Sequence, residues 1–154
     1  MKLALTKTIK EVYSVVLKDL SSYGGFPFYG IAVLCAIFLE LYGFAVDLII
    51  SLIAITMIVA AVRLAYFKPR PGQPRKKYTT LYERIDNSSF PSIHAARAVM
   101  ISFAIYSLAP VLLTVLVLLT VAVLLSRIHF KRHDWKDLLV GIILGIVMGY
   151  YFFP

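Results

Sequence analysis

The chain has 154 residues, of which 60% are hydrophobic, and its mean hydropathy is +0.84. This apolar content is well above the roughly 45–50% of an ordinary soluble domain, so it argues against a soluble protein and indicates an integral membrane protein. The formal net charge of +8 favours anionic lipid headgroups or an anionic substrate as partners, and we expect no nucleic-acid partner.

The length leaves room for one bundle of a few membrane spans and no separate soluble domain, so residues 1–154 are predicted to form a single domain. The single cysteine, Cys35, excludes an intrachain disulfide and a cysteine-based zinc site. Because Cys35 lies inside an apolar run, we expect it to be a buried small hydrophobe.

The first segment, residues 1–24, places apolar and charged residues on opposite faces of a helix. Lysines take one face, and the other carries Leu3, Leu5, Ile9, Val12, Val15, Val16 and Leu20. This pattern predicts an amphipathic helix that lies in the membrane interface.

Residues 26–154 are predicted to be an all-α bundle of about five transmembrane helices. The apolar segments are 26–44, 45–67, 91–109, 110–127 and 138–154. Each is close to the roughly 20 residues that a helix needs to cross the hydrocarbon core, and a helix satisfies its own backbone groups there. Five spans place the polar loop 68–90 and the amphipathic segment at the same membrane face.

Three polar clusters fall at the span ends on this charged face. They read RLAYFKPRP from Arg63, SSFPSIHAAR from Ser88 and SRIHFKRHDWKD from Ser126. Phosphoryl transfer without a metal needs cationic donors around the phosphoryl oxygens, a nucleophile, and a proton source for the leaving oxygen. The clusters contain all three kinds of group, which indicates a phosphoryl-transfer site.

The residue types indicate which side chains could bind the phosphoryl oxygens. Bidentate contacts to phosphate are available from Arg63, Arg70 and Arg127, and Ser92 adds a neutral donor near the start of a helix.

Two histidines remain for nucleophilic and proton-transfer chemistry, His94 and His133. Because His133 and Asp137 are four residues apart, they share a face if a helix begins near Arg132, and the carboxylate can then fix the imidazole tautomer. The other ring nitrogen is left free to attack.

The clusters resemble, in order, the three motifs of the type 2 phosphatidic acid phosphatase superfamily. SRIHFKRHDWKD fits S-R-x5-H-x3-D, PSIH fits P-S-x-H, and RLAYFKPRP approximates K-x6-R-P. The resemblance covers about residues 63–141, with Gly141 where the family often has glycine. Arg63 stands where the family usually has lysine, and Ile93 stands where glycine is common.

The resemblance implies a role for each motif residue. The phosphoryl group would be bound by Arg63, Arg70, Ser92 and Arg127. His133 would attack phosphorus to form a phosphohistidine, oriented by Asp137, and His94 would protonate the leaving group and then activate water. The family needs no metal, so neither a metal nor a cofactor is expected.

Two further basic groups have alternative roles. Arg97, one turn after His94, is expected either to contact the phosphate from a second layer or to pair with a carboxylate such as Asp134. The run 75–77 is expected to be a solvated, lipid-facing patch, or else to recognise a second phosphate or an anionic headgroup.

These observations together predict a multi-pass cell-membrane lipid phosphatase whose substrate enters laterally through a gap between helices. Membrane members of the family act on phosphatidic acid, phosphatidylglycerol phosphate, polyprenyl diphosphates or the 1-phosphate of lipid A, and a polyprenyl diphosphate or another bacterial envelope lipid is the first expectation. A lipid phosphotransferase and a non-catalytic lipid-binding protein stay open as alternatives. The positive-inside rule favours a cytoplasmic site and the family an extracytoplasmic one, and the sequence does not indicate the oligomeric state.

Overall fold

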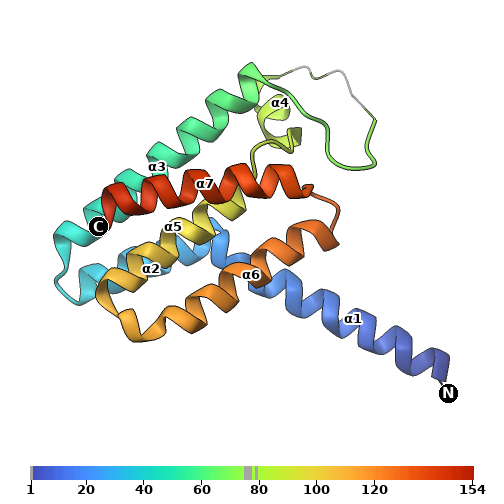
Figure 1. Cartoon of the computed structure of the whole chain (residues 1–154), viewed down its shortest axis with the longest axis horizontal. Coiled ribbons are helices and arrows are strands. Elements are labelled where there is room, and N and C mark those ends of the chain that lie inside the picture. Colours follow the sequence, from blue (N-terminus) through green and yellow to red (C-terminus); the bar gives the residue numbers. More distant parts are fainter. Residues whose placement is uncertain (1, 75–77, 79) are drawn as a thin grey trace.

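The computed structural model describes residues 2–74, 78 and 80–154, with side chains from residue 11 onward. This part of the chain is helical and contains no strand (Figure 1). The elements are α1 (Lys2–Leu20), η1 (Ser21–Gly24), α2 (Phe26–Phe38), α3 (Tyr42–Ala65), α4 (Leu81–Asn87), α5 (Ile93–Leu108), η2 (Pro110–Leu112), α6 (Leu113–His129) and α7 (Trp135–Phe152). The predicted all-α class is therefore confirmed.

Three helices of the described residues are long and apolar enough to cross a membrane: Tyr42–Ala65, Pro110–His129 and Trp135–Phe152. A fourth is possible if Glu11–Gly24 and Phe26–Phe38, which are bent by 52°, form one broken span. Two of the five expected spans are shorter than the sequence indicated, because helix α2 has 13 residues and helix α5 has 16. Helix α5 begins only after its N-cap, Ser92, and ends at Leu108, with Ala109 as its C-cap before Pro110.

Apolar side chains cover much of the outer surface of these helices. Val111, Met57 and Tyr151 are more than 60% exposed, and many Leu, Ile and Val side chains accompany them. A soluble monomer does not carry an apolar surface of this extent, so the surface fits a multi-pass membrane protein. Cys35 belongs to it, since it is exposed on α2 rather than buried as expected.

The centre of the bundle is helix α5, which lies between α6 and α7 (Figure 1). Glycines at positions 141, 145 and 149 form a stripe along α7 that faces α5. A Cβ atom at Gly141 would lie 2.5 Å from the Ser92 carbonyl oxygen, and one at Gly145 would lie 2.5 Å from the Ala96 carbonyl oxygen. The absence of side chains allows close backbone approach, as in other membrane helix pairs, and it holds the beginning of α7 against the beginning of α5.

The loop between α3 and α5 contains helix α4, where a polar loop without a helix was expected. Its N-cap is Thr80, whose hydroxyl accepts a hydrogen bond from the Glu83 amide at 3.2 Å. The T-x-x-E spacing in the sequence is a signal for the start of this helix. The expected basic patch at 75–77 lies outside the described residues.

Candidate active site

A cavity of about 540 Å³ gathers residues from all three motifs. Its lining comes from the end of α1, η1, the end of α3, the loop that follows α3, α4, the start of α5, the end of α6, and the α6–α7 connection. The lining residues are Lys18, Ser21, Arg63, Arg70, Asp86, Ile93, His94, Arg127, Phe130, Arg132 and His133. Five of the eight residues predicted to form the site therefore share one cavity.

His133 lies in the short connection between α6 and α7, which folds back onto the end of α6. The amides of Arg132 and His133 both donate to the Arg127 carbonyl oxygen, at 3.0 and 3.3 Å. Lys131 takes a left-handed backbone conformation with φ of 51°, which turns the chain toward α7. These contacts fix the position of His133 relative to the end of helix α6.

The tautomer of His133 follows from a backbone contact. Its Nδ1 atom lies 2.6 Å from the carbonyl oxygen of Ser89. Because a carbonyl oxygen can only accept, Nδ1 carries the proton and donates it, and in the neutral ring Nε2 keeps its lone pair. No sequence motif predicts this contact, because every residue type has a backbone carbonyl.

Asp137 was expected to hold the His133 ring, but its nearest oxygen lies 3.8 Å from Nδ1. This separation permits an electrostatic interaction and is too long for a hydrogen bond. Asp137 instead accepts from the Lys68 ammonium at 2.7 Å and from the Asp134 amide at 3.1 Å, and its side chain is fully buried. It is part of a capping box in which Asp134 is the N-cap of α7.

Lys68 joins the loop after α3 to the start of α7. Its ammonium lies 2.5 Å from a carboxylate oxygen of Asp134 and 2.7 Å from one of Asp137. Desolvation of the ammonium opposes protonation, but the two carboxylates outweigh it and raise the pKa of Lys68, so the side chain stays charged. Lys68 was not among the predicted site residues, because it lies between the motif positions.

Burial also determines the charge of His133. Desolvation lowers the pKa of His133 below its usual 6.5, while the Asp137 carboxylate and the Ser89 carbonyl partly oppose that shift. The imidazole therefore stays neutral at neutral pH, which is the form in which Nε2 is a nucleophile.

The start of α5 presents His94 to the cavity and places Ser92 behind it. The Ser92 hydroxyl accepts a hydrogen bond from the Ala95 amide at 3.4 Å, and the Ser92 amide donates to the Asp137 carbonyl oxygen at 3.0 Å. Ser92 is fully buried and does not line the cavity. Its visible role is to cap α5 and to join α5 to α7.

The three motif arginines differ in how free their guanidinium groups are. Arg63 donates to the carbonyl oxygens of Ile85 and Pro91, both at 2.9 Å, so much of it is engaged in holding the loop. Arg70 donates to the Asp86 carbonyl oxygen at 2.6 Å. Burial and the nearby positive Arg132 lower the pKa of Arg70, with Asp86 opposing them, which indicates a cavity with excess positive charge.

Arg127 completes this group at the end of α6. Its Nε donates to the Ser126 hydroxyl at 3.2 Å, and the side chain lines the cavity. The remaining guanidinium donors can meet a phosphoryl oxygen in the bidentate way that arginine favours.

Arg97 does not line the cavity. Its guanidinium donates to the Thr56 hydroxyl at 2.8 Å and lies 3.8 Å from the centre of the Phe26 ring. The expected partner Asp134 is instead paired with Lys68. Three residues of α-helix turn by about 300°, so Arg97 points about 60° away from His94, toward α3 and α2.

Within the described ranges, no group of three or more His, Cys, Asp or Glu side chains converges in a way that could hold a metal ion. The cavity is lined by cations, histidines and a single carboxylate, a set that suits an oxyanion.

The arrangement is that of a membrane-embedded helical bundle with a cationic, histidine-bearing cavity at the helix ends. Residues 44–154 match the family model of the PAP2 superfamily, and the chain belongs to this superfamily, as the three motifs indicated. At the family level its members are phosphatases. No curated protein and no solved structure matches the chain significantly.

The match begins within helix α3, after α1, η1 and α2. Two residues of the cavity wall, Lys18 and Ser21, therefore come from outside the matched region.

Proposed function

We propose that the protein is a membrane lipid phosphatase that hydrolyses a lipid phosphate monoester or diphosphate through a phosphohistidine intermediate. One observation carries the proposal: His133, His94, Arg70 and Arg127 line the same cavity. Within that cavity, Nδ1 of His133 donates its hydrogen bond to the Ser89 carbonyl oxygen. Nε2 is left as the free nucleophilic atom of that ring.

The two chemical steps follow from these positions. Nε2 of His133 attacks phosphorus, and the bond between phosphorus and the leaving oxygen breaks. The bound phosphoryl anion offsets the cations around His94 and favours its protonated form, which gives its proton to that oxygen. His94 then takes a proton from water, the water oxygen attacks the phosphohistidine, and inorganic phosphate leaves as the P–N bond breaks. Arg70 and Arg127 hold the phosphoryl oxygens throughout.

The direction of the helices supports the full set of five spans. Helices α3 and α6 end at the cavity, and α2, α5 and α7 begin on the same side of the bundle (Figure 1). If each of the five crosses the bilayer once, all motif residues lie at one membrane face and α1 lies in the interface beside them. On α1, Val12, Val15 and Val16 are exposed, as an interfacial helix requires.

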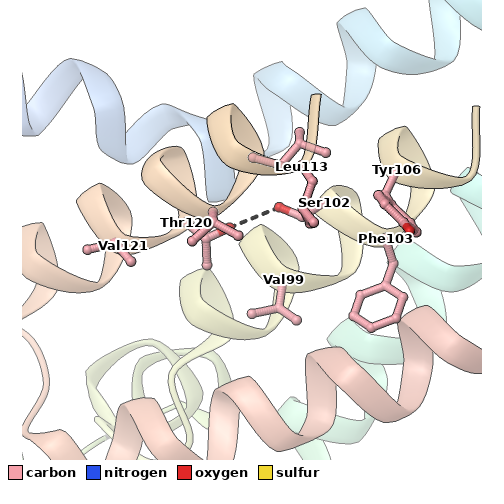
Figure 2. A pocket seen from close by; sticks show the side chains of 9 residues that line it. Val99, Ser102, Phe103, Tyr106, Leu113, Thr120 and Val121 are labelled. Carbon is pink, nitrogen blue, oxygen red and sulfur yellow. Dashed lines mark hydrogen bonds between the residues drawn. The ribbon is translucent and has the colours of Figure 1, made fainter. Parts of the chain in front are cut away.

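In this proposal the lipid tail binds in a second cavity, of about 300 Å³, between α5 and α6 (Figure 2). Its lining is Val99, Ser102, Phe103, Tyr106, Leu113, Leu116, Val117, Thr120 and Val121. Ser102 and Thr120 share a hydrogen bond of 2.9 Å, so their hydroxyls are paired with each other and the surface offered to a ligand is apolar. We define this cavity as the tail groove.

The tail groove is aligned with the active site. Val99 lies five residues after His94 on α5, and Val121 lies six residues before Arg127 on α6. At 1.5 Å per residue these separations are about 8 and 9 Å, so a lipid with its phosphate in the cationic cavity would extend its chain along the groove.

Filling the tail groove tests this placement. We expect Val117→Trp to raise KM at least about 5-fold for a long-chain lipid phosphate and little for a short-chain one, since the indole would occupy space that only the long chain uses. Leu118→Trp is the matched control, because Leu118 is the next residue of α6, is also exposed, and does not line the groove. Equal changes for the two variants, or for the two chain lengths, would contradict a tail in the groove.

The reaction itself is tested by phosphate release from detergent-purified protein with EDTA present. The panel is phosphatidic acid, phosphatidylglycerol phosphate, undecaprenyl diphosphate and lipid A. We expect release from at least one of these lipids. A well-folded protein that forms phosphorylated acceptor without free phosphate would be a phosphotransferase, and one that releases nothing from any lipid would be a binding protein.

A further inference from the structure

The N-terminal segment forms one wall of the active-site cavity although it lies outside the family match. Lys18 in the last turn of α1 and Ser21 in η1 both line the cavity. A Cβ atom at Gly24 would lie 2.5 Å from the His94 carbonyl oxygen, so η1 packs directly on the backbone of His94. This segment is therefore built into the site.

A contact with α6 fixes the other end of this wall. The rings of Tyr13 and His129 meet edge to face, with centroids 5.3 Å apart. Helix α1 is thus held beside the end of α6 and the start of the connection that carries Arg132 and His133.

The cavity has more positive charge than one phosphate needs. Its lining contains five cationic side chains and one carboxylate, that of Asp86. A phosphate monoester brings a charge of only about −1.5 to −2 at neutral pH. The motif arginines already account for three of the cations, and the two that remain are Lys18 and Arg132.

Lys18 and Arg132 are exposed on the cavity wall, and neither side chain has a hydrogen-bonded or ion-paired partner among the described residues. Arg132 is close enough to the phosphate-binding arginines to lower the pKa of Arg70. Two unpaired cations next to the phosphate-binding arginines repel them unless an anion lies between.

We propose that Lys18 and Arg132 form a second anion subsite, which binds the lipid-proximal phosphoryl group of a diphosphate while the terminal group lies at His133. The inference rests on the proposed function and narrows its substrate to a lipid diphosphate. His133 attacks the terminal phosphorus, the bond to the bridging oxygen breaks, and His94 protonates that oxygen. The products are a lipid monophosphate and, after hydrolysis of the phosphohistidine, inorganic phosphate.

The test uses two substrates that differ by one phosphate, farnesyl diphosphate and farnesyl monophosphate, with full-length protein in one detergent. We expect Lys18→Gln and Arg132→Gln each to lower kcat/KM for the diphosphate about 10-fold or more, and for the monophosphate less than about 3-fold. Lys131→Gln is the matched control, because Lys131 is exposed beside Arg132 and does not line the cavity.

The outcomes separate this inference from the proposed function. Equal losses for both substrates would mean that the two cations attract any anionic lipid, and would overturn the subsite, as would unchanged kinetics. A wild-type protein that hydrolyses the monophosphate and not the diphosphate would also overturn it while leaving the phosphatase proposal standing.

If neither substrate is hydrolysed, the proposed function is contradicted. The subsite can then still be tested by measuring the affinity of the protein for inorganic anions. Wild-type protein should bind inorganic pyrophosphate at least about 10-fold more tightly than inorganic phosphate, and Lys18→Gln should reduce that ratio. Equal affinity for the two anions would overturn the subsite.

Discussion

Replacing His133 with alanine is expected to lower kcat for phosphate release by a factor on the order of 10³ or more. The Nε2 atom of this ring is the only protein atom that forms a bond to phosphorus in the proposed mechanism, so no neighbouring group can take its place. The side chain is 7% exposed and lies in the α6–α7 connection, where it makes one hydrogen bond, to the Ser89 carbonyl. Losing a single bond of this kind costs about 1 kcal/mol, so the fold should survive.

The control for this prediction is Lys136→Ala. Lys136 is three residues later, is exposed in the first turn of α7, and does not line the cavity. Phosphate release per folded protein is measured for both variants. Labelling of the protein by a phosphate-labelled lipid is measured after a quench in alkaline denaturant, because the P–N bond of a phosphohistidine hydrolyses in acid. An active His133→Ala protein, or a labelled one, would refute the assignment of the nucleophile.

The family and five of the eleven residues that line the cavity could be predicted, because both depend on residue types at fixed spacing. Arg70, His94, Arg127 and His133 were found from three short motifs, and the structure brings their side chains to one cavity. Gly141 was noted as a motif position, and the structure supplies the reason, since a side chain there would collide with the Ser92 carbonyl.

The other contacts of the site could not be predicted, because they depend on backbone atoms and on the direction in which a side chain points from its helix. The Ser89 carbonyl that fixes the His133 tautomer has no signature in the sequence. Arg97 was expected near the phosphate or a carboxylate because it lies about one helical turn after His94. Three residues fall short of a full turn, so its side chain points away from His94 and reaches Thr56 on α3. Lys68 lies between motif positions, and only the folded loop shows that it reaches two carboxylates of the α7 capping box.

Lys68 connects the loop that carries Arg70 with the start of α7, next to the proposed nucleophile His133, and Lys68→Met is expected to show what this connection does. The loop residue Arg70 is two positions away, and the ammonium of Lys68 is bound to both Asp134 and Asp137 at the start of α7. Without that link, Arg70 and His133 are no longer held in one geometry, and a displacement of about 1 Å costs roughly 100-fold in rate. We expect kcat to fall about 10- to 100-fold with little change in KM.

The pH profile distinguishes a positioning role from general destabilisation. In the wild type, burial lowers the pKa of His133, so activity should persist below pH 6.5 and fall only as pH drops through that lowered value. In Lys68→Met the Asp137 carboxylate, 3.8 Å from Nδ1, loses its cation and stabilises the protonated ring, although burial and Arg63 still oppose protonation of His133.

The acid limb of the Lys68→Met profile should therefore move to higher pH. Lys68→Arg should restore most of the rate and the wild-type limb, because it returns the charge to the two carboxylates. Lys136→Met, which removes an exposed ammonium from the first turn of α7, should change neither. If Lys68→Met lowers thermal stability but leaves the acid limb of the folded fraction unmoved, the ion pairs only support the fold, and the Asp137 charge does not reach the nucleophile.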